Sequence, residues 1–515
     1  MSGTMDRRHL LRVGGALSML GGAAPLALQL AAAGSAAGQA ATDYKALVCI
    51  FLFGGNDAHN MVLATDNDSW GRYWSARNTG ADAIALMPAG TAATPVGQVS
   101  PLTGRTADND TPEAWGGVLP ITPRTPNPVP AGTNAGVRTF ALHPFLAPLR
   151  PIWDEQRLAV VANVGPLIQP ITKSQYQALT VALPTNLFSH NDQQSVWQAN
   201  ATEGARVGWG GRLSDLMAGM NGGNTLFTAV STAGNAVFLS GQSVVQYQLS
   251  TGTQPAQVIT GQSGGSLFGS SLAPARVRAL ISDTSIAHNF AADYATVTSR
   301  SLTAATTVNA AFGEAVVTGV RTPTAYTNPI SGAVEANTLA TQLYAVARMV
   351  AAGATLGMRR QVFFVSLGGW DTHDFQNTTQ PNLLAKVAHA MAYFDSALAS
   401  IGGVDRRTQV TAFTASDFGR TFTTNGDGTD HAWGSHHFVM GGAVRGQNIY
   451  GQYPTLGADV GGFNNPNMVS NALIPTTAVD QYGATLGAWF GAPQSELSSI
   501  FPRLPNFSVR DLGFL

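Results

Sequence analysis

Residues 45–53 read Lys-Ala-Leu-Val-Cys-Ile-Phe-Leu-Phe, and the run is stopped by Gly54 and Gly55. An unbroken apolar run of this length, ended by glycines, is typical of a strand that is buried on both faces, as in a parallel sheet. Leu158–Val164 is a second run of the same kind. These runs predict an α/β fold with a mainly parallel central sheet.

The clearest repeating unit lies near the C-terminus. Gln361–Leu367 reads as a strand, and Gln409–Thr414 reads as the next one. Between them, apolar residues recur at helical spacing, namely Leu383, Leu384, Val387, Met391, Phe394 and Leu398. Strand, helix and strand in this order form a βαβ unit, whose crossover is nearly always right-handed. A further helix over about 335–359 is expected to cover the same sheet, so that helices lie on both of its faces.

Two stretches look unlike the rest of the chain. Residues 78–137 are rich in Gly, Pro, Thr and Ala, and they are expected to form a long surface excursion. Residues 205–330 are rich in Ser, Thr, Ala and Gly, with only short apolar runs, and they are expected to be an inserted or covering region. Residues 41–515 are interpreted as a single domain, with 205–330 as a possible insertion in it.

The composition of the chain limits the classes of partner that it could bind. The chain has 515 residues, of which 44% are hydrophobic and 11% charged, as in a globular protein. A net charge of -1 gives no support to nucleic-acid binding or to a polybasic membrane patch. Cys49 is the single cysteine, so no intrachain disulfide can form. The sequence identifies no protein partner.

The first forty residues read as an export signal. Arg7 and Arg8 form an adjacent pair, a weakly apolar stretch follows from Val13 to Ala33, and Gly38–Ala40 suits cleavage. The arginine pair points to the twin-arginine route. A membrane anchor is the alternative, but glycines and a proline interrupt the stretch, and a span needs about 20 solidly apolar residues. We therefore expect a periplasmic or secreted protein with no stable membrane span.

Aspartate and histidine side chains follow three of the predicted strands and fill a later loop. The candidate metal ligands are Asp57, Asp371, His373, Asp417, Asp430, His431, His436 and His437. In parallel α/β sheets, functional groups lie beyond the carboxyl ends of the strands. We therefore expect one cavity there, with Asp57, Asp371, His373, Asp417 and His431 around it. Mixed carboxylates and imidazoles suit Zn²⁺, Mn²⁺ or a mixed pair of divalent ions, and a two-metal site would need about six or seven ligands from several segments. The alternative for each residue is a cap or an internally bonded side chain.

Two further residues are candidates for catalysis. Ser189 precedes an apparent helix that contains Val196 and Trp197. It is interpreted either as the N-cap of that helix or as a nucleophile. Arg420 follows the strand 409–414. It is interpreted either as a bidentate clamp for a tetrahedral oxyanion or as one half of a structural salt bridge.

At these motifs the chain resembles the family called domain of unknown function 1501, which is grouped with the alkaline phosphatase and sulfatase superfamily. The resembling stretches are residues 51–60, 142–164, 189–194, 208–213, 369–374 and 414–451. The resemblance implies an alkaline-phosphatase-like fold, with a central sheet between two layers of helices and a long polar insertion.

The superfamily's order of site residues can be carried over by position. The resemblance implies a first ligand at Asp57, a nucleophile at Ser189, an Asp and His pair at Asp371 and His373, a later ligand at Asp417, and final histidines among His431, His436 and His437. The pair at 371 and 373 is closer in sequence than usual. Phe418 stands where the superfamily has a histidine, which Asp430-His431 would supply from the loop. Cys49 lacks the sequence context of a formylglycine sulfatase.

Two functions are therefore expected. The density of Asp and His favours a metal-dependent hydrolase or transferase that acts on a phosphate or sulfate ester, either a small molecule or a polymer. The departures from the superfamily pattern favour an exported binding or assembly protein on the same fold. Metal content would discriminate between them.

Overall fold

The computed structural model describes residues 43–127, 137–252, 256, 266–459 and 463–515. The predicted export signal lies outside these residues. The central sheet has the strand order β13-β5-β12-β11-β1-β10-β6-β7, with β16 also paired to β5. Its strands are β1 (Lys45–Phe53), β5 (Leu158–Gly165), β6 (Ala229–Ser231), β7 (Tyr247–Gln248), β10 (Arg360–Gly368), β11 (Val410–Ser416), β12 (Ser435–Met440), β13 (Ile449–Tyr450) and β16 (Thr477–Ala478).

The sheet is mainly parallel, as predicted. β1 lies at its centre and pairs in parallel with β10 and β11, with Ile50 opposite Val365 and Thr414. β12 is the exception, because it runs antiparallel to both β11 and β5. The predicted strands at 45–53, 158–164, 361–367 and 409–414 are confirmed to within two residues at each end.

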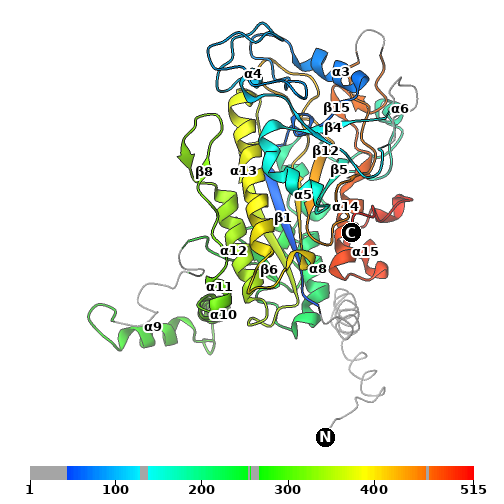
Figure 1. Cartoon of the computed structure of the whole chain (residues 1–515). Helices are drawn as coiled ribbons and strands as arrows, with labels where there is room; N and C mark the ends of the chain where they lie inside the picture. Colours follow the sequence, from blue (N-terminus) through cyan, green and yellow to red (C-terminus); the bar gives the residue numbers. More distant parts are fainter. Residues whose placement is uncertain (1–42, 128–136, 253–255, 257–265, 460–462) are drawn as a thin grey trace.

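Helices pack on both faces of the sheet, which makes the protein a mixed α/β fold (Figure 1). The described α-helices are α3 (Asn67–Arg77), α4 (Pro112–Trp115), α5 (Arg150–Asp154), α6 (Lys173–Ala178), α7 (His190–Ala199), α8 (Trp209–Met217), α9 (Ala273–Ile281), α10 (Asn289–Phe312), α11 (Ala315–Thr318), α12 (Thr338–Ala352), α13 (Gln376–Leu398), α14 (Val479–Phe490) and α15 (Gln494–Ile500).

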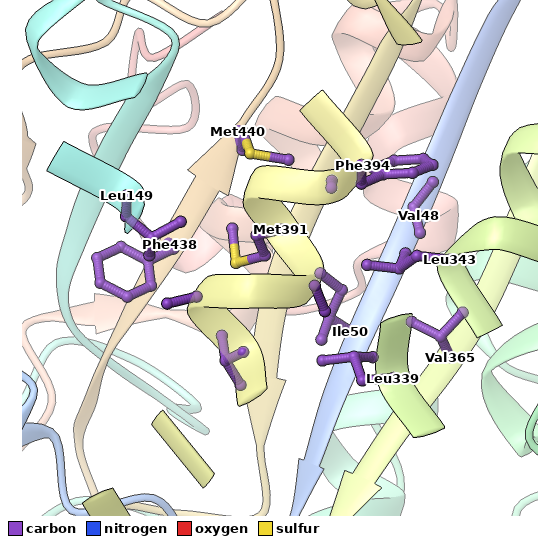
Figure 2. Packing of buried hydrophobic residues seen from close by; sticks show 14 of the residues in the cluster. Val48, Ile50, Leu149, Leu339, Leu343, Val365, Met391, Phe394, Phe438 and Met440 are labelled. Atoms are coloured by element: carbon purple, nitrogen blue, oxygen red, sulfur yellow. The ribbon is translucent and has the colours of Figure 1, made fainter. Parts of the chain in front are cut away.

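The alternation of side chains along β1 explains the two helical layers. Val48 and Ile50 point to one face and pack with Leu343 of α12 and with Met391 and Phe394 of α13 (Figure 2). The intervening residues of β1, such as Cys49, belong to a second buried cluster, together with residues of α8 and α14. Because successive strand residues face opposite ways, an unbroken apolar run supplies both cores.

α12 is shorter at both ends than the helix predicted over about 335–359, because it spans Thr338–Ala352. α12 begins at Thr338 because the Asn337 side chain caps it by accepting from the backbone N–H of Ala340, 3.2 Å away. α13 begins at Gln376, before its first apolar residue, so that its first turn reaches the carboxyl edge of the sheet.

The two polar stretches are only partly regular. The part of 78–137 that is described includes α4 and β3 (Leu119–Ile121), which joins β2 (Val62–Ala64) and β4 (Phe140–Leu142) in a small antiparallel sheet. The stretch 205–330 supplies β6 and β7 at one edge of the central sheet, as well as α8 to α11. Short pairs β8 (Tyr326–Thr327) with β9 (Val334–Glu335), and β14 (Met468–Val469) with β15 (Ala472–Leu473), complete the described strands. None of the described helices combines the length and the apolar character needed to cross a membrane.

Candidate metal centre

Three of the predicted segments and one further helix meet beyond the carboxyl ends of β10 and β11. Asp371 follows β10, Asp417 follows β11, His431 lies on the loop between β11 and β12, and His190 is the first residue of α7. One ligand atom each from His190, Asp371 and His431 lies within 4.8 Å of the others. Asp371 and His431 are 60 positions apart in the chain, and His190 is farther from both, yet Nε2 of His431 lies 3.2 Å from Oδ1 of Asp371.

Asp371 is the centre of the group. Its Oδ1 lies 3.2 Å from Nε2 of His431 and 3.2 Å from Nε2 of His373, and its Oδ2 lies 3.4 Å from Nε2 of His190. Nη2 of Arg420 donates to the same Oδ1 at 2.8 Å. Three imidazoles therefore present the same ring atom to one carboxylate.

The opposite nitrogen of each imidazole has its own partner. Nδ1 of His190 lies 2.7 Å from Oδ2 of Asp417, Nδ1 of His431 lies 2.8 Å from the carbonyl oxygen of Phe188, and Nδ1 of His373 lies 3.2 Å from Oδ1 of Asp430. A carbonyl oxygen or a carboxylate accepts, so the proton belongs on Nδ1 in each ring. Nε2 then carries a lone pair, as a metal-binding imidazole requires.

The charges around the group act in opposite directions. Burial raises the pKa of Asp371, but Arg420, His190 and His373 outweigh it, so the pKa ends below its usual value. The hydrogen bond with Asp417 raises the pKa of His190. Burial, together with nearby His190 and Arg420, lowers the pKa of His431. An ionised carboxylate and a neutral His431 are the protonation states that bind a divalent ion.

A cation fits this donor set. Nε2 of His373 and Nε2 of His431 lie 2.9 Å apart. With both protons on Nδ1, two lone pairs and the Asp371 carboxylate face one another at about 3 Å, which is repulsive without a positive charge among them. Two or three imidazoles and one carboxylate are a usual donor set for Zn²⁺ and for related divalent ions. His190, Asp371 and His431 could hold such an ion, with His373 beside them.

Asp417 and Phe418 support this group from behind. The Asp417 side chain is fully buried, and its Oδ2 also accepts from Gln194 at 2.8 Å and from the backbone of Gly54 at 3.1 Å. The ring of Phe418 packs against His190 and His431, with centroid separations of 4.8 and 4.6 Å. Asp417 therefore orients a histidine and is not itself among the three grouped ligands.

Arg420 is buried beside the group. Its side chain has no exposed surface, and burial lowers its pKa while Asp371 opposes that shift. Within the described residues, Nε and Nη1 have no hydrogen-bond partner, whereas Nη2 bonds Asp371. In the described part of the chain, two buried guanidinium nitrogens next to the carboxylate therefore carry N–H groups without an acceptor.

Ser189 occupies the N-cap position of α7 without acting as a cap. Its Oγ donates to Oδ2 of Asp192 at 3.0 Å and accepts no backbone N–H of the helix. It lies between Phe188, whose carbonyl oxygen contacts His431, and His190, which contacts Asp371. No contact links its hydroxyl to the histidines among the described residues.

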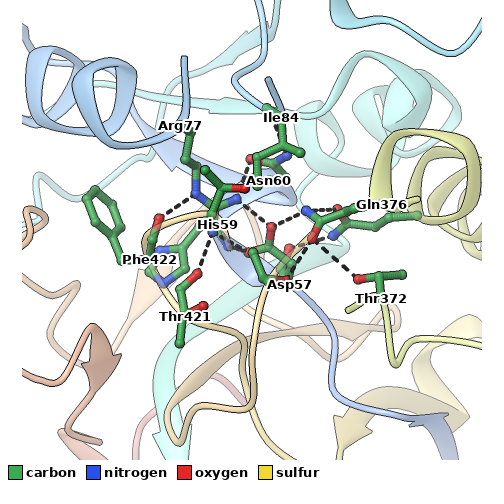
Figure 3. A network of polar contacts seen from close by, with 12 residues as sticks. Asp57, His59, Asn60, Arg77, Ile84, Thr372, Gln376, Thr421 and Phe422 are labelled. Carbon is green, nitrogen blue, oxygen red and sulfur yellow. Dashed lines mark hydrogen bonds and ion pairs between the residues drawn. The ribbon is translucent and has the colours of Figure 1, made fainter. Parts of the chain in front are cut away.

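Asp57 is not brought into the group. Its carboxylate is fully buried and is bonded by Arg77 at 2.5 and 3.0 Å, by Gln376 at 2.6 Å and by the backbone of His59 at 3.1 Å (Figure 3). The guanidinium of Arg77 also donates to the carbonyls of Thr421 and Phe422. Asp57 therefore ties together the first strand end, α3, α13 and the loop after β11.

His436 and His437 lie in β12 and face opposite sides of the sheet. His436 stacks on Tyr453 at 4.6 Å, and its Nδ1 accepts from the backbone N–H of Asn163 at 3.0 Å. His437 packs against Trp197 at 4.8 Å in the other core. Burial lowers the pKa of each to about 3, so both are neutral core residues.

Sequence reasoning missed His190. It lies in the segment that was selected for Ser189, directly after that residue. The signal was available, because His190 starts a helix in a segment already expected at the site, but a lone histidine there has no partner visible in sequence. Its partners, Asp371 and Asp417, come from two different strand ends.

Comparisons with known proteins give one result. No curated protein matches the sequence at a significant level. A model of a protein family of unknown function, DUF1501, matches residues 44–501. That match covers most of the chain, including every residue of the candidate metal centre, and the chain therefore belongs to the DUF1501 family.

Proposed function

We propose that this protein is a metal-dependent hydrolase or transferase that acts on a phosphate or sulfate ester outside the cytoplasm, on an alkaline-phosphatase-like fold. The observation that carries the proposal is the convergence of three imidazole Nε2 atoms on Asp371, each with its Nδ1 held by an acceptor. Such anchoring orients a histidine for metal binding. The export step rests on the arginine pair Arg7 and Arg8.

The residues would share the work as follows. His190, Asp371 and His431 would hold the ion, and His373 would complete the set. A bound divalent ion would supply Lewis-acid polarisation of the ester oxygen. Arg420 would donate its two free nitrogens to nonbridging oxygens of the substrate. Ser189 would attack the phosphorus or sulfur atom of the ester, with its proton passing to Asp192, which it already bonds. The bond from that atom to the ester's alcohol oxygen would break, and the alcohol would leave with the bonding electron pair and take a proton from solvent. Water, or a second alcohol in a transferase, would then displace the serine oxygen and regenerate the hydroxyl.

A second function is favoured by a separate observation. Asp57, His436 and His437 are engaged elsewhere, which leaves ligands for one ion and not for a pair. A non-catalytic binding or assembly protein that retains one metal would need no more.

The test combines metal content with turnover. The protein is purified from its own host, and its metal is measured by elemental analysis alongside hydrolysis of a panel of aryl phosphates and sulfates. We expect about one divalent ion per chain by the ligand set and turnover that is lost in Ser189→Ala with metal retained. Ser499→Ala, which removes a surface hydroxyl bonded only to Glu496, is the matched control. Metal without turnover would select the binding protein, and the absence of both would refute the metal centre.

A further inference from the structure

A helical arm carries a concentration of exposed apolar side chains. α9 stands away from the sheet and from the helices that cover it (Figure 1). Seven of the seventeen exposed large hydrophobic residues among the described residues lie between 268 and 297, so they are not scattered singly. They are Phe268, Leu272, Leu280, Ile286, Phe290, Tyr294 and Val297.

Three of these residues form one stripe on α10. Phe290, Tyr294 and Val297 are spaced by four and three residues and are 81%, 66% and 64% exposed. The stripe continues at the same spacing through Ser301 to Val308, where it is buried. There α10 packs on α12, with the guanidinium of Arg348 lying 4.3 Å from the ring of Phe312. Among the residues that the structure describes, the same helix face is thus covered in its second half and exposed in its first.

Charged residues flank the bare half of the stripe. In a heptad that places Phe290 and Val297 at d and Tyr294 at a, Asp293 and Arg300 take successive g positions. Both are exposed, and neither forms an ion pair with another described residue. One flank of the helix therefore carries a negative charge near one end of the stripe and a positive charge near the other.

We propose that the bare stripe of α10 pairs with the same stripe of a second copy of this chain, in antiparallel orientation. A twofold axis between Tyr294 and Val297 brings Asp293 of each copy beside Arg300 of the other, because antiparallel helices place the same flank together. A parallel pair would not bring like flanks together. The apolar stripe supplies the contact area, and the two charge pairs fix the orientation.

Charge exchange tests this arrangement with the full chain. Sedimentation velocity should show a dimer for the wild type, and Asp293→Arg and Arg300→Asp should each weaken dimerisation at least tenfold, because each creates two like-charge pairs. The double variant should dimerise again. An equimolar mixture of the two single variants should form the heterodimer, since every pair across that interface is then opposite in charge.

The controls separate this interface from other associations. Asp82→Arg makes the same charge change on an exposed residue outside the arm and should leave the dimer unchanged. Tyr294→Glu should give a monomer. A wild-type chain that is monomeric at about 100 µM, well above the range of a specific dimer, would overturn the proposal. So would a dimer that is indifferent to the single charge variants, or single variants that fail to form a heterodimer when mixed.

Discussion

Nε2 of His373 and Nε2 of His431 lie 2.9 Å apart, although each ring already uses Nδ1 as a donor. Unless a proton or a metal ion lies among them, the two lone pairs and the carboxylate of Asp371 repel one another, and the proposed function places a divalent ion there. Chelation should therefore lower the melting temperature of the wild type, because an ion that binds only the folded state adds about 2.7 kcal/mol when its free concentration is about 100 times Kd.

His373→Ala should lower the melting temperature by a similar amount and make it insensitive to chelator. His389→Ala is the matched control, because His389 bonds Asn337 and Thr324 away from this group. It should lower stability and keep the response to chelator. Equal melting curves of the wild type with and without chelator would argue against a bound metal.

Asp417 is expected to act through His190. Its Oδ2 holds Nδ1 of His190 at 2.7 Å, and removal of such a partner typically weakens metal binding by about 10- to 100-fold. Asp417→Asn should therefore raise the dissociation constant of the metal by this factor, as measured by competition with a chromophoric chelator. Asp395→Asn is the control, because Asp395 is a buried carboxylate that pairs with Arg157 and contacts none of the candidate metal ligands. It should leave the affinity for the metal unchanged. An unaltered affinity in Asp417→Asn would mean that His190 needs no such support.

We expect Asp57 to contribute to the stability of the fold and not to the binding of metal. Its partner Arg77 is fully buried, so Asp57→Ala leaves an uncompensated guanidinium in the interior. Breaking a buried pair in this way costs about 3–5 kcal/mol. Urea denaturation should show that loss, while elemental analysis of the folded variant should show an unchanged metal content. Loss of the metal at full stability would restore Asp57 as a ligand.

The difference between Asp57 and Asp371 shows what sequence could predict. The buried runs fixed the position of the strands, and the topology of a parallel sheet brings both aspartates to the same edge. Whether a carboxylate is available to a ligand depends on which side chains of other elements reach it. Arg77, on α3, pairs with Asp57 and buries it, whereas the side chain of Asp371 remains 45% exposed. A pattern of strand ends carries no information about such a partner.

The two histidines of β12 illustrate a second limit. His436 and His437 follow directly after the loop that carries Asp430 and His431, but they belong to strand β12, which begins at Ser435. Adjacent strand residues face opposite sides of a sheet, so His436 and His437 are buried in the cores on its two faces. The strand was hidden by its polar start, since residues 435–437 are Ser-His-His.

A buried carboxyl far from the metal centre should set a pH dependence of stability. Asp480 lies in the first turn of α14, is 1% exposed and accepts from the backbone N–H of Arg503 at 3.0 Å. Burial raises its pKa from 3.8 to about 6. The folded state therefore holds this proton more tightly than the unfolded state, and the resulting stability is fully present below about pH 4 and is lost as pH rises to about 6.

Asp480→Asn removes this titration while its side-chain oxygen can still accept from Arg503. The variant should match the wild type near pH 4 and exceed it by up to about 3 kcal/mol at pH 7 and above, since one pKa unit corresponds to about 1.4 kcal/mol. Urea denaturation of both proteins at several pH values measures the difference. Asp511→Asn, an exposed carboxylate in the same C-terminal region, should show no such trend. A stability difference between Asp480→Asn and the wild type that stays constant from pH 4 to pH 8 would show that Asp480 ionises at its ordinary pKa in the folded protein.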